Sequence, residues 1–490
     1  MPSLTGTGYF NRSPYVLGLI IFVVFIPACA QASAFLDSLV SFRDKLNLSG
    51  YLKNETAFRY IEPRSFTKIR NIAYIRGTYA INDMAEITGA AWAYYDLVYN
   101  LFDYDTISAR AKRDAIQPLN FINSLAERTD SGIIDLREFY LDLFLEKADV
   151  RIGRQFIIWG VLTGVRIVDE LNPMNFRELI LPDLLDYRIP LWSVRTNLYL
   201  DNSELQFVWI PEVKFHKPAP PGSEWELLQE VPGTVYPDNF TLKNSEFGLR
   251  WRGHVMDTEL SLSYFYTWDD FPVIFRKIPI LPTVVDGTIA SPEFFPRYTR
   301  LHMYGATMQR QIGSQILKGE IAYVTGKYFG LSTIDRNNDG ILDNQGELKR
   351  DHIRWGLGTD FNIWKTDISP GVTQWVVLNY DPALIQSRYD TAFNLFIRKE
   401  LPSLKAVFQM LVLRMITLDE LYIKPKIIFN VTDLFEISAG LDLLYGKSSQ
   451  AGVAAKDGKA VDIIEIEQRY QFLGNFAGNK RIFVEFKYSF

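Results

Sequence analysis

The feature that most constrains the fold is the last stretch of the chain, 480–490, which reads KRIFVEFKYSF. Successive side chains of a β-strand point to opposite faces, so every second residue shares a face. One face of this strand is apolar and carries Ile482, Val484, Phe486, Tyr488 and Phe490. The other face is polar and carries Arg481, Glu485, Lys487 and Ser489. The sequence therefore predicts a two-faced strand that ends the protein on an aromatic residue.

This ending resembles the closing strand of bacterial outer-membrane β-barrels. In such barrels the apolar side of each strand meets lipid and the polar side faces the lumen. The resemblance implies an assembly signal at Tyr488 and Phe490, which the barrel assembly machinery reads. We therefore expect the bacterial outer membrane as the location and outer-membrane lipid as the immediate surroundings.

Residues 1–34 have the pattern of a secretory signal peptide. Arg12 precedes an apolar run over 15–28, and small residues follow it. The run is too short for a comfortable transmembrane helix. We expect cleavage near Ala34, which leaves a short periplasmic segment over 35–45 before the barrel.

Cysteine use and charge exclude two classes of function. Cleavage removes Cys29, the only cysteine, so disulfide and thiolate chemistry are not expected. The formal net charge is −5, and an acidic chain is a poor ligand for nucleic acid. We expect no nucleic-acid partner.

From residue 46 onward, alternating segments recur at the length that a tilted strand needs to cross a bilayer. We predict about eighteen strands, with sixteen as the alternative because the alternation is poor over 391–420. They lie at 46–60, 68–81, 85–100, 136–149, 150–160, 190–201, 204–213, 245–256, 258–270, 299–312, 315–330, 351–365, 368–381, 391–402, 404–417, 421–432, 434–447 and 481–490.

The connections between these segments alternate between tight and long. The long insertions lie at 101–135, 161–189, 214–244, 271–298, 331–350 and 448–480. Outer-membrane barrels have short periplasmic turns and long external loops. The rhythm predicts an all-β fold, a transmembrane antiparallel β-barrel over 46–490 with both ends on the periplasmic side.

The most distinctive interior stretch is 153–160, GRQFIIWG, followed by Asn172-Pro173. Here the chain resembles a family of Gram-negative outer-membrane barrels known only as a domain of unknown function. The family is porin-like and has a Gly-Arg/Lys-Gln…Trp-Gly hairpin before an Asn-Pro; the segment 472–476 is similar to it too. The resemblance implies a transport role, as a channel or as the outer-membrane partner of an inner-membrane transporter that exports lipid or hydrophobic compounds.

The loop after Gly160 is the candidate constriction. Asn172 can cap a helix with Pro173 at its first position, which predicts a short helix over 173–181. The apolar run 179–181 predicts that the loop folds into the lumen or packs on the rim; the alternative is a loop folded over neighbouring external loops. Its polar candidates are Arg166, Asp169, Glu170, Asn172, Arg177 and Glu178. Inside the lumen we expect its charged members to face wall charges such as Arg250 and Arg252.

The alternation assigns charged residues of both signs to the lumen. The candidates are Arg151, Arg195, Arg250, Arg252, Arg354, Glu436 and Asp442. A mixture of positive and negative charges suits a water-filled passage and does not indicate a preference for anions or for cations.

The loop at 331–350 contains a candidate metal site. Oxygen-bearing side chains recur at the spacing of an EF-hand calcium loop, at Asp335, Asn337, Asp339 and Asp343, with Gly340 at the sharp turn. The usual Glu is displaced by one position, to Glu347. The sequence favours Ca²⁺ over the alternative, an Asp/Asn/Gly-rich external turn.

Catalysis finds little support, because the four histidines are scattered without metal-ligand spacing. We expect no enzymatic activity. The sequence favours a porin-like channel for diffusion of small solutes. The alternatives are an outer-membrane component of lipid or hydrophobe transport and a structural barrel around a periplasmic partner.

Overall fold

The computed structural model describes residues 46–102, 132–219, 223–225, 233–277, 284–285, 288–289, 293–331, 343–447 and 472–490. The chain divides into two compact units, Met1–Lys45 and Leu46–Phe490. All described residues belong to the second unit. The predicted signal peptide and the segment 35–45 lie outside them.

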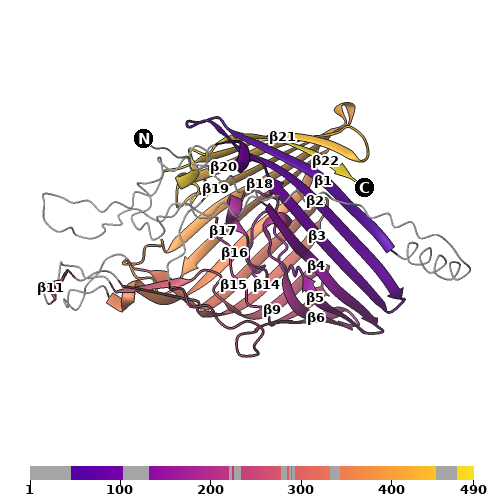
Figure 1. The fold of residues 1–490 in the computed structure, drawn as a ribbon. Helices are drawn as coiled ribbons and strands as arrows, with labels where there is room; N and C mark the ends of the chain where they lie inside the picture. The colour runs from indigo at the N-terminus through magenta and orange to yellow at the C-terminus, as the bar shows by residue number, and fades with distance from the viewer. Residues whose placement is uncertain are drawn as a thin grey trace, which may run out of the picture. The chain divides into compact units, whose positions relative to one another are not determined.

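The second unit is a closed antiparallel β-barrel (Figure 1). Its described residues form an 18-stranded sheet in which strands follow one another around the ring. The first nine strands are β1 (Leu46–Arg59), β2 (Ser65–Asn82), β3 (Ala85–Asp96), β4 (Gly132–Leu145), β5 (Ala148–Gln155), β6 (Leu191–Leu200), β7 (Ser203–Ile210), β8 (Glu246–Val255) and β9 (Thr258–Trp268). The other nine are β14 (Arg300–Ile312), β15 (Gln315–Gly330), β16 (Glu347–Ile363), β17 (Thr366–Val377), β18 (Tyr389–Leu401), β19 (Ala406–Met415), β20 (Glu420–Asn430), β21 (Phe435–Tyr445) and β22 (Arg481–Ser489).

The first and last strands close the ring. β1 pairs with β22 from Tyr51↔Ser489 to Arg59↔Arg481, and Gly50 and Phe490 exchange two backbone hydrogen bonds of 3.0 Å. The predicted faces of β22 are confirmed at their ends, because Arg481 is buried while Phe490 is exposed. Closure pairs the backbone groups that an open sheet edge would leave unsatisfied in lipid.

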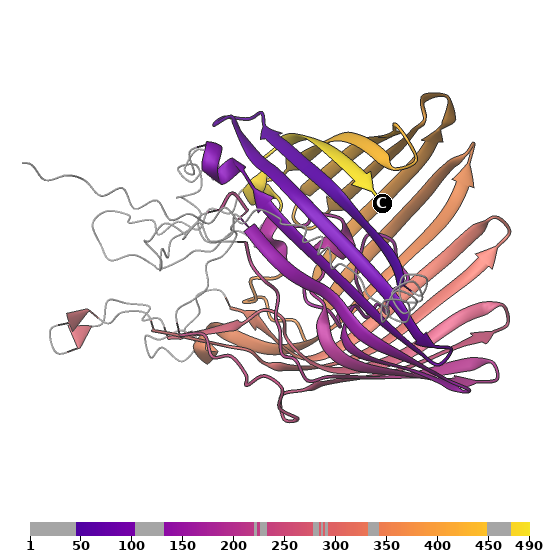
Figure 2. The ribbon, with the colours of Figure 1, turned by 45° about the vertical axis from the view of Figure 1, so that its right-hand side comes forward.

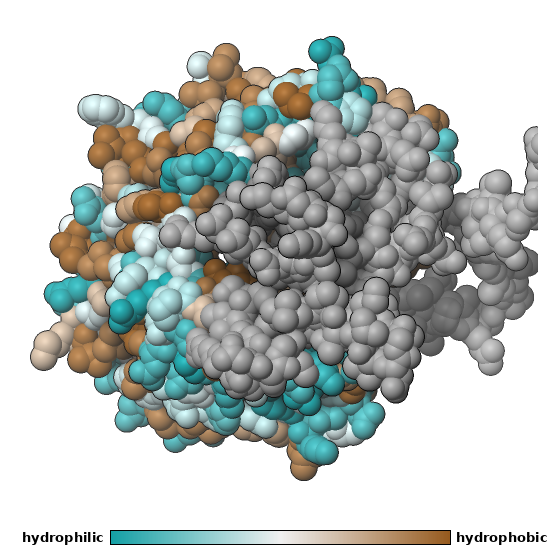
Figure 3. All heavy atoms as spheres, turned by 90° about the vertical axis from the view of Figure 1, so that its left-hand side faces the viewer, coloured by the Kyte–Doolittle hydropathy of each residue, from teal (hydrophilic) through white to brown (hydrophobic). Residues whose placement is uncertain are grey.

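Neighbouring residues of a strand differ sharply in exposure, which separates the outer face from the inner one. On β8, Leu249 is exposed and Arg250 is buried; on β9, Leu262 is exposed and Ser261 is buried. Apolar side chains occur around the visible outer margin of the face seen in Figure 3. The outer face is therefore suited to lipid and the inner face to a polar lumen.

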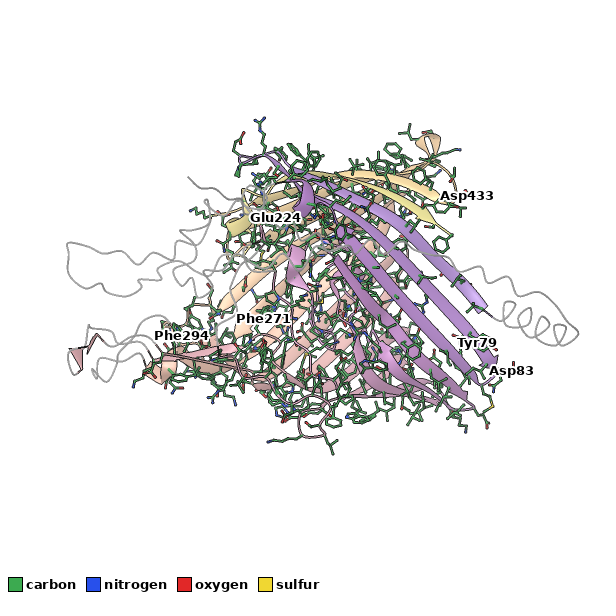
Figure 4. The ribbon with its side chains drawn as sticks, viewed as in Figure 1. Tyr79, Asp83, Glu224, Phe271, Phe294 and Asp433 are labelled. Carbon is green, nitrogen blue, oxygen red and sulfur yellow. The ribbon has the colours of Figure 1, made fainter. Side chains whose placement is uncertain are left out.

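Tight turns and long connections lie at opposite ends of the barrel. Asp83 and Asp433 mark the end with tight turns, and Phe271 and Phe294 mark the other (Figures 2 and 4). Between β9 and β14, two small sheets extend the long-loop end, namely β10 (Val273–Lys277) with β13 (Glu293–Arg297), and β11 (Val284–Val285) with β12 (Thr288–Ile289). The helices are α2 (Val98–Leu101), η3 (Phe176–Glu178), α4 (Leu184–Tyr187), η4 (Asp343–Gly346), η5 (Pro402–Leu404) and η6 (Gly474–Phe476).

One hairpin differs from the prediction. The sequence placed strands at 136–149 and 150–160, but β4 ends at Leu145 and β5 begins at Ala148. The turn is made by two residues without glycine or proline, Glu146 and Lys147, so no turn-forming residue marks it. Among the described residues, no helix is both long enough and apolar enough to span a membrane.

Candidate functional site

The connection between β5 and β6, residues 156–190, is called here the lumenal loop because it lies against the inner face of the barrel. Glu320 of β15 is 4 % exposed, whereas its neighbour Ile321 is 47 % exposed and points outward. The Glu320 carboxylate accepts hydrogen bonds from the backbone N–H groups of Val161 (2.5 Å), Leu162 (2.7 Å) and Val168 (3.2 Å). The sequence left the placement of this loop open, and the structure shows the loop inside the lumen.

Further contacts carry the lumenal loop across the barrel. Asn394 of β18 donates from Nδ2 to the carbonyl oxygen of Thr163 at 2.9 Å. Lys424 of β20 donates from Nζ to the carbonyl oxygen of Leu181 at 2.6 Å. The loop leaves the wall at β5 and reaches strands on the far side, so it narrows the passage through the ring.

The motif residues of 153–160 build the stem of this loop. Gly153 has φ +138°, and a Cβ there would lie 2.2 Å from the carbonyl oxygen of Phe139, so only glycine fits. Gln155 donates to the carbonyl oxygen of Ser193 at 3.1 Å and thereby joins β5 to β6. The motif that resembles the family is therefore the structural base of the loop.

Asn172 has a role other than the predicted one. Its Oδ1 accepts from the backbone N–H of Ile157 at 2.7 Å, and its Nδ2 donates to the carbonyl oxygen of Ile189 at 2.9 Å. The side chain thus ties the two sides of the loop together. The predicted helix over 173–181 is wrong: the segment contains only the 3-10 turn η3, for which Asn175 is the capping residue.

An apolar core fixes the lumenal loop to the wall. Its members are Ile157, Trp159, Ile167, Val168, Leu171, Leu191, Val208, Ile210, Phe265, Leu301, Met303, Ala322 and Val324. Trp159 also donates from Nε1 to Oε1 of Gln206 at 2.6 Å, which satisfies the indole N–H. Inward-facing wall residues of β7, β9, β14 and β15 are apolar here because the loop covers them.

A second apolar cluster explains the poor alternation over 391–420. Leu181 of the lumenal loop belongs to a cluster against which Leu411 and Leu413 of β19 pack. These inner-face residues are covered by the loop, so both faces of β19 are apolar. Leu473 and Phe476 belong to the same cluster, which places the second family-like segment, 472–476, beside the loop.

Two inward-facing glycines of the wall leave space for side chains of the lumenal loop. A Cβ at Gly356 would lie 2.6 Å from Cδ1 of Leu162, and a Cβ at Gly305 would lie 2.9 Å from Cγ1 of Val168. Real Cβ atoms essentially never approach so closely. The wall is thus shaped to the loop, and a larger residue at either glycine would displace it.

Glu178 anchors the far part of the loop to three wall cations. Its carboxylate lies 2.5 Å from Nζ of Lys68 and 3.3 Å from Nη2 of Arg481, and it also pairs with Arg70. Burial by itself raises the pKa of Glu178, but attraction to Arg70, Lys68 and Arg481 outweighs burial and holds the pKa well below its usual range. The carboxylate stays ionised and holds the loop to β2 and β22.

The other charged loop candidates find partners within the loop or on β16. Asp169 pairs with Arg188 at 2.5 Å, and Arg166 donates to the carbonyl oxygens of Asp169 (2.6 Å) and Asn172 (3.1 Å). Glu170 pairs with Arg354 at 3.1 Å. Burial raises the pKa of Glu170, but Arg354 and Arg166 lower it more, and the net pKa is depressed.

The expected pairing of loop charges with Arg250 and Arg252 is wrong. Arg252 pairs with Glu204 on the neighbouring strand at 2.6 Å. The guanidinium of Arg250 lies over the ring of Trp159, 5.6 Å from its centroid. Glu170 of the loop pairs instead with Arg354 on β16. Glu178 pairs with cations on β2 and β22. Arg177 is buried, 5.7 Å over the ring of Tyr94.

Three of the four remaining wall candidates lie in ion pairs. Arg151 pairs with Asp142 at 2.6 Å, Asp442 with Arg481 at 2.6 Å, and Glu436 with Lys487 at 3.0 Å. Arg195 of β6 stands opposite Arg151 in the sheet register. The sequence reasoning missed Lys68, Arg70 and Glu320, because the loop residues that they contact lie more than a hundred residues away along the chain.

A cavity remains between the lumenal loop and the wall. It is lined by charged residues of both signs and is called here the charged cavity. The cations of its lining are Lys53, Lys68, Arg70, Arg177, Lys424 and Arg481. The anions are Glu55, Glu178, Asp183, Asp186, Asp442 and Glu485. Burial raises the pKa of Asp186.

His216, outside the strands, contacts the lumenal loop at Met174. Its Nδ1 accepts from the backbone N–H of Met174 at 2.9 Å and lies 3.6 Å from Oδ2 of Asp270. Burial, with Arg166 and Lys327, lowers the pKa of His216 well below 6.5. Burial raises the pKa of Asp270 well above 3.8. Burial therefore disfavours the charged form of both groups.

The candidate calcium site lies outside the description. Asp335, Asn337 and Asp339 are not among the described residues, and neither is the side chain of Asp343. Within the described ranges, no group of three or more His, Cys, Asp or Glu residues is arranged to hold a metal ion.

Comparison with solved structures finds outer-membrane proteins. OccAB3 of Acinetobacter baumannii shares 10% sequence identity with a TM-score of 0.48, covering 91% of this chain and 99% of that one. OccK8 (OprE) of Pseudomonas aeruginosa shares 9%, with a TM-score of 0.46 and coverage of 92% and 99%. OmpF of Salmonella typhi, in complex with daunomycin, shares 8%, with a TM-score of 0.40 and coverage of 92% and 99%. No curated protein matches the chain.

A family model gives the assignment that the stem motif suggested. The model is described as a protein of unknown function, DUF1302, and it matches residues 85–380. The matched span runs from β3 to the end of β17 and contains the whole lumenal loop. Because the match covers more than half of the sequence, this chain belongs to the DUF1302 family.

Proposed function

We propose that the protein is a porin-like channel of the bacterial outer membrane through which small polar solutes diffuse past the lumenal loop. A closed barrel of eighteen strands is wide enough to enclose an aqueous passage. The lumenal loop narrows that passage without covering the whole inner wall.

The charged cavity is the observation that carries the proposal. Its lining includes Lys53, Glu55, Asp186 and Lys424, on two wall strands and the loop. Opposed charges around a narrow space suit hydrated solutes and exclude apolar ones, because an apolar solute would have to strip water from these groups without replacing it. The cavity therefore supports selection for polar cargo.

Two observations disfavour transport of lipid or hydrophobic compounds. Such cargo needs an exposed apolar lumenal path or a lateral gap between strands. The apolar inner surface around Phe265 and Met303 is covered by the lumenal loop, and the pairing of β1 with β22 is continuous from Tyr51 to Arg59. The loop also occupies space that a periplasmic partner inside the barrel would need.

The test is conductance of the purified, folded protein in planar lipid bilayers. Folding is first checked by heat-modifiable migration on a gel, in which the closed barrel moves faster than the boiled chain. We expect stable single-channel steps in KCl, and swelling of liposomes in isotonic solutions of small sugars that declines as the sugar grows. Folded protein that gives neither steps nor swelling would overturn the proposal.

A further inference from the structure

The inner face of the wall from β5 to β8 carries four arginines, namely Arg151 on β5, Arg195 on β6, and Arg250 and Arg252 on β8. Their inward direction follows from their neighbours, because Ile152 and Leu249 are exposed on the outer face. β6 and β8 are both hydrogen-bonded to β7. The four guanidinium groups therefore gather on one sector of the lumen wall.

Two of the four arginines are committed to carboxylates, and two are not. Arg151 holds Asp142 through two hydrogen bonds of 2.6 and 2.9 Å, and Arg252 holds Glu204 at 2.6 Å. For Arg195 and Arg250, no carboxylate within the described ranges lies at ion-pair distance. Arg250 is only 9 % exposed, and its Nε has no hydrogen-bond partner among the described residues.

Like charges face one another on this sector. Arg195 stands opposite Arg151 in register, and Arg250 is within electrostatic range of both Arg252 and Arg195. The carboxylates that act electrostatically on Arg195 or Arg250 include Asp142 from β4, Glu204 from β7 and Glu259 from β9. Asp142 and Glu204 already hold Arg151 and Arg252, and Glu259 lies 3.9 Å from His254. Asp149 shares the inner face of β5 with Arg151 and accepts a hydrogen bond from the hydroxyl of Tyr199 at 2.5 Å.

A buried guanidinium without a counter-charge is unfavourable, and a bound anion would offset both its desolvation and the repulsion between like charges. The planar fork of arginine matches the oxygens of a carboxylate or a phosphate group. We infer that Arg195 and Arg250, supported by Arg151 and Arg252, form a lumenal binding site for the carboxylate or phosphate group of a small anionic solute.

The site lies beside the path of the proposed channel. The guanidinium of Arg250 sits over the ring of Trp159, so it lies at the stem of the lumenal loop. A solute that passes the loop stem meets this sector. The inference rests on the proposed channel function and adds its solute class, anions that carry carboxylate or phosphate oxygens.

The test compares wild type with the double variant Arg195→Gln/Arg250→Gln. In a KCl gradient, wild type is expected to favour chloride over potassium, and millimolar inorganic phosphate or succinate is expected to block the current reversibly. The double variant should lose the chloride preference and bind both blockers on the order of tenfold more weakly, because a charge-assisted hydrogen bond is lost at each position. The matched control is Arg414→Gln, since Arg414 lies on the outer face paired with Asp419; it should behave as wild type.

The outcomes separate this inference from the proposed function. A conducting wild type that prefers potassium, or a double variant blocked as strongly as wild type, would overturn the anion site and leave the channel standing. If the folded protein does not conduct, calorimetry with inorganic phosphate in detergent decides the site independently: heat of binding in wild type and none in the variant supports it, and equal heats reject it. If the double variant does not fold, the half-buried Arg195→Gln variant alone takes its place in the same comparison.

Discussion

The indole ring of Trp159 packs directly onto Gly248 of β8. A Cβ atom at Gly248 would lie 2.8 Å from Cη2 of Trp159. The same ring donates a hydrogen bond to Gln206 and lies beneath Arg250. Trp159 is therefore fixed on three sides, and the position of the lumenal loop depends on the absence of a side chain at residue 248.

Gly248→Ala should loosen the lumenal loop without opening the barrel. The added methyl group forces the buried ring of Trp159 to move, and overpacking of this kind costs about 1–3 kcal/mol. We expect a lower melting temperature in heat-modifiable migration and a noisier single-channel current. Gly89→Ala is the control, because its Cβ would lie 3.7 Å from Phe139, an ordinary contact. Equal noise in both variants would contradict the fixed position of Trp159.

Glu178→Gln should release the far part of the loop. The substitution leaves the charges of Lys68, Arg70 and Arg481 without their shared carboxylate, and removal of one partner from a buried ion pair costs about 3–5 kcal/mol. We expect a larger mean conductance and a shift of the reversal potential toward anions, since the loop loses one negative charge beside three cations. Glu62→Gln removes an exposed carboxylate that pairs with Arg64 and should change neither. Unchanged conductance in Glu178→Gln would show that the loop is held without this contact.

Deletion of 164–186 should widen the passage. It removes Glu178, Leu181 and the loop wall of the charged cavity. We expect single-channel conductance to rise and ion selectivity to weaken in a variant that still shows heat-modifiable migration. Wild-type conductance and selectivity in such a folded variant would mean that the constriction lies elsewhere.

His216 and Asp270 should have opposite effects on stability as the pH changes. The depressed pKa of His216 means that below pH 6.5 the unfolded chain takes up its proton first, so this group lowers stability as the pH falls. The raised pKa of Asp270 means that above pH 3.8 the unfolded chain ionises first, so this group lowers stability as the pH rises. Between these limits the two contributions oppose one another in wild type.

Single substitutions should separate the two contributions. His216→Asn keeps a hydrogen-bond acceptor for Met174, and its stability relative to wild type should rise as the pH falls from 6.5 toward 4. Asp270→Asn should show the opposite slope. Each slope is at most about 1.4 kcal/mol per pH unit. Urea unfolding at several pH values measures these slopes. Slopes of the same sign would contradict the opposite pKa shifts of His216 and Asp270.

The barrel was predictable because its signal is local. The alternation in β22 and β9 is read from consecutive residues, and the tight turns near Asp83 and Asp433 end the segments they join. Where a local signal is lacking, the prediction is wrong, as at the turn of Glu146 and Lys147. The strand count of eighteen is confirmed, although β19 alternates poorly because the loop covers its inner face.

The lumenal loop was predictable only in part, since its structure depends on distant partners. The apolar run at 179–181 indicated a buried segment, but no pattern in the sequence joins Glu178 to Lys68 or to Arg481. Asn172 fitted a helix cap by its local sequence, yet Ile157 and Ile189 use both of its polar atoms. A charged side chain on a loop can reach many different strands, so the sequence does not specify its partner. For this reason the prediction that Arg250 and Arg252 face the loop charges was wrong.

The anchors of the lumenal loop also constrain the order in which the protein forms. Glu178 meets Arg481, 303 residues further along the chain, on the strand that closes the ring. Loop closure over such a separation is entropically unfavourable until the ends are already near one another. The contact between Glu178 and Arg481 therefore exists only when β22 is in place beside β1. The closing strand thus completes both the wall of the barrel and the anchoring of the loop.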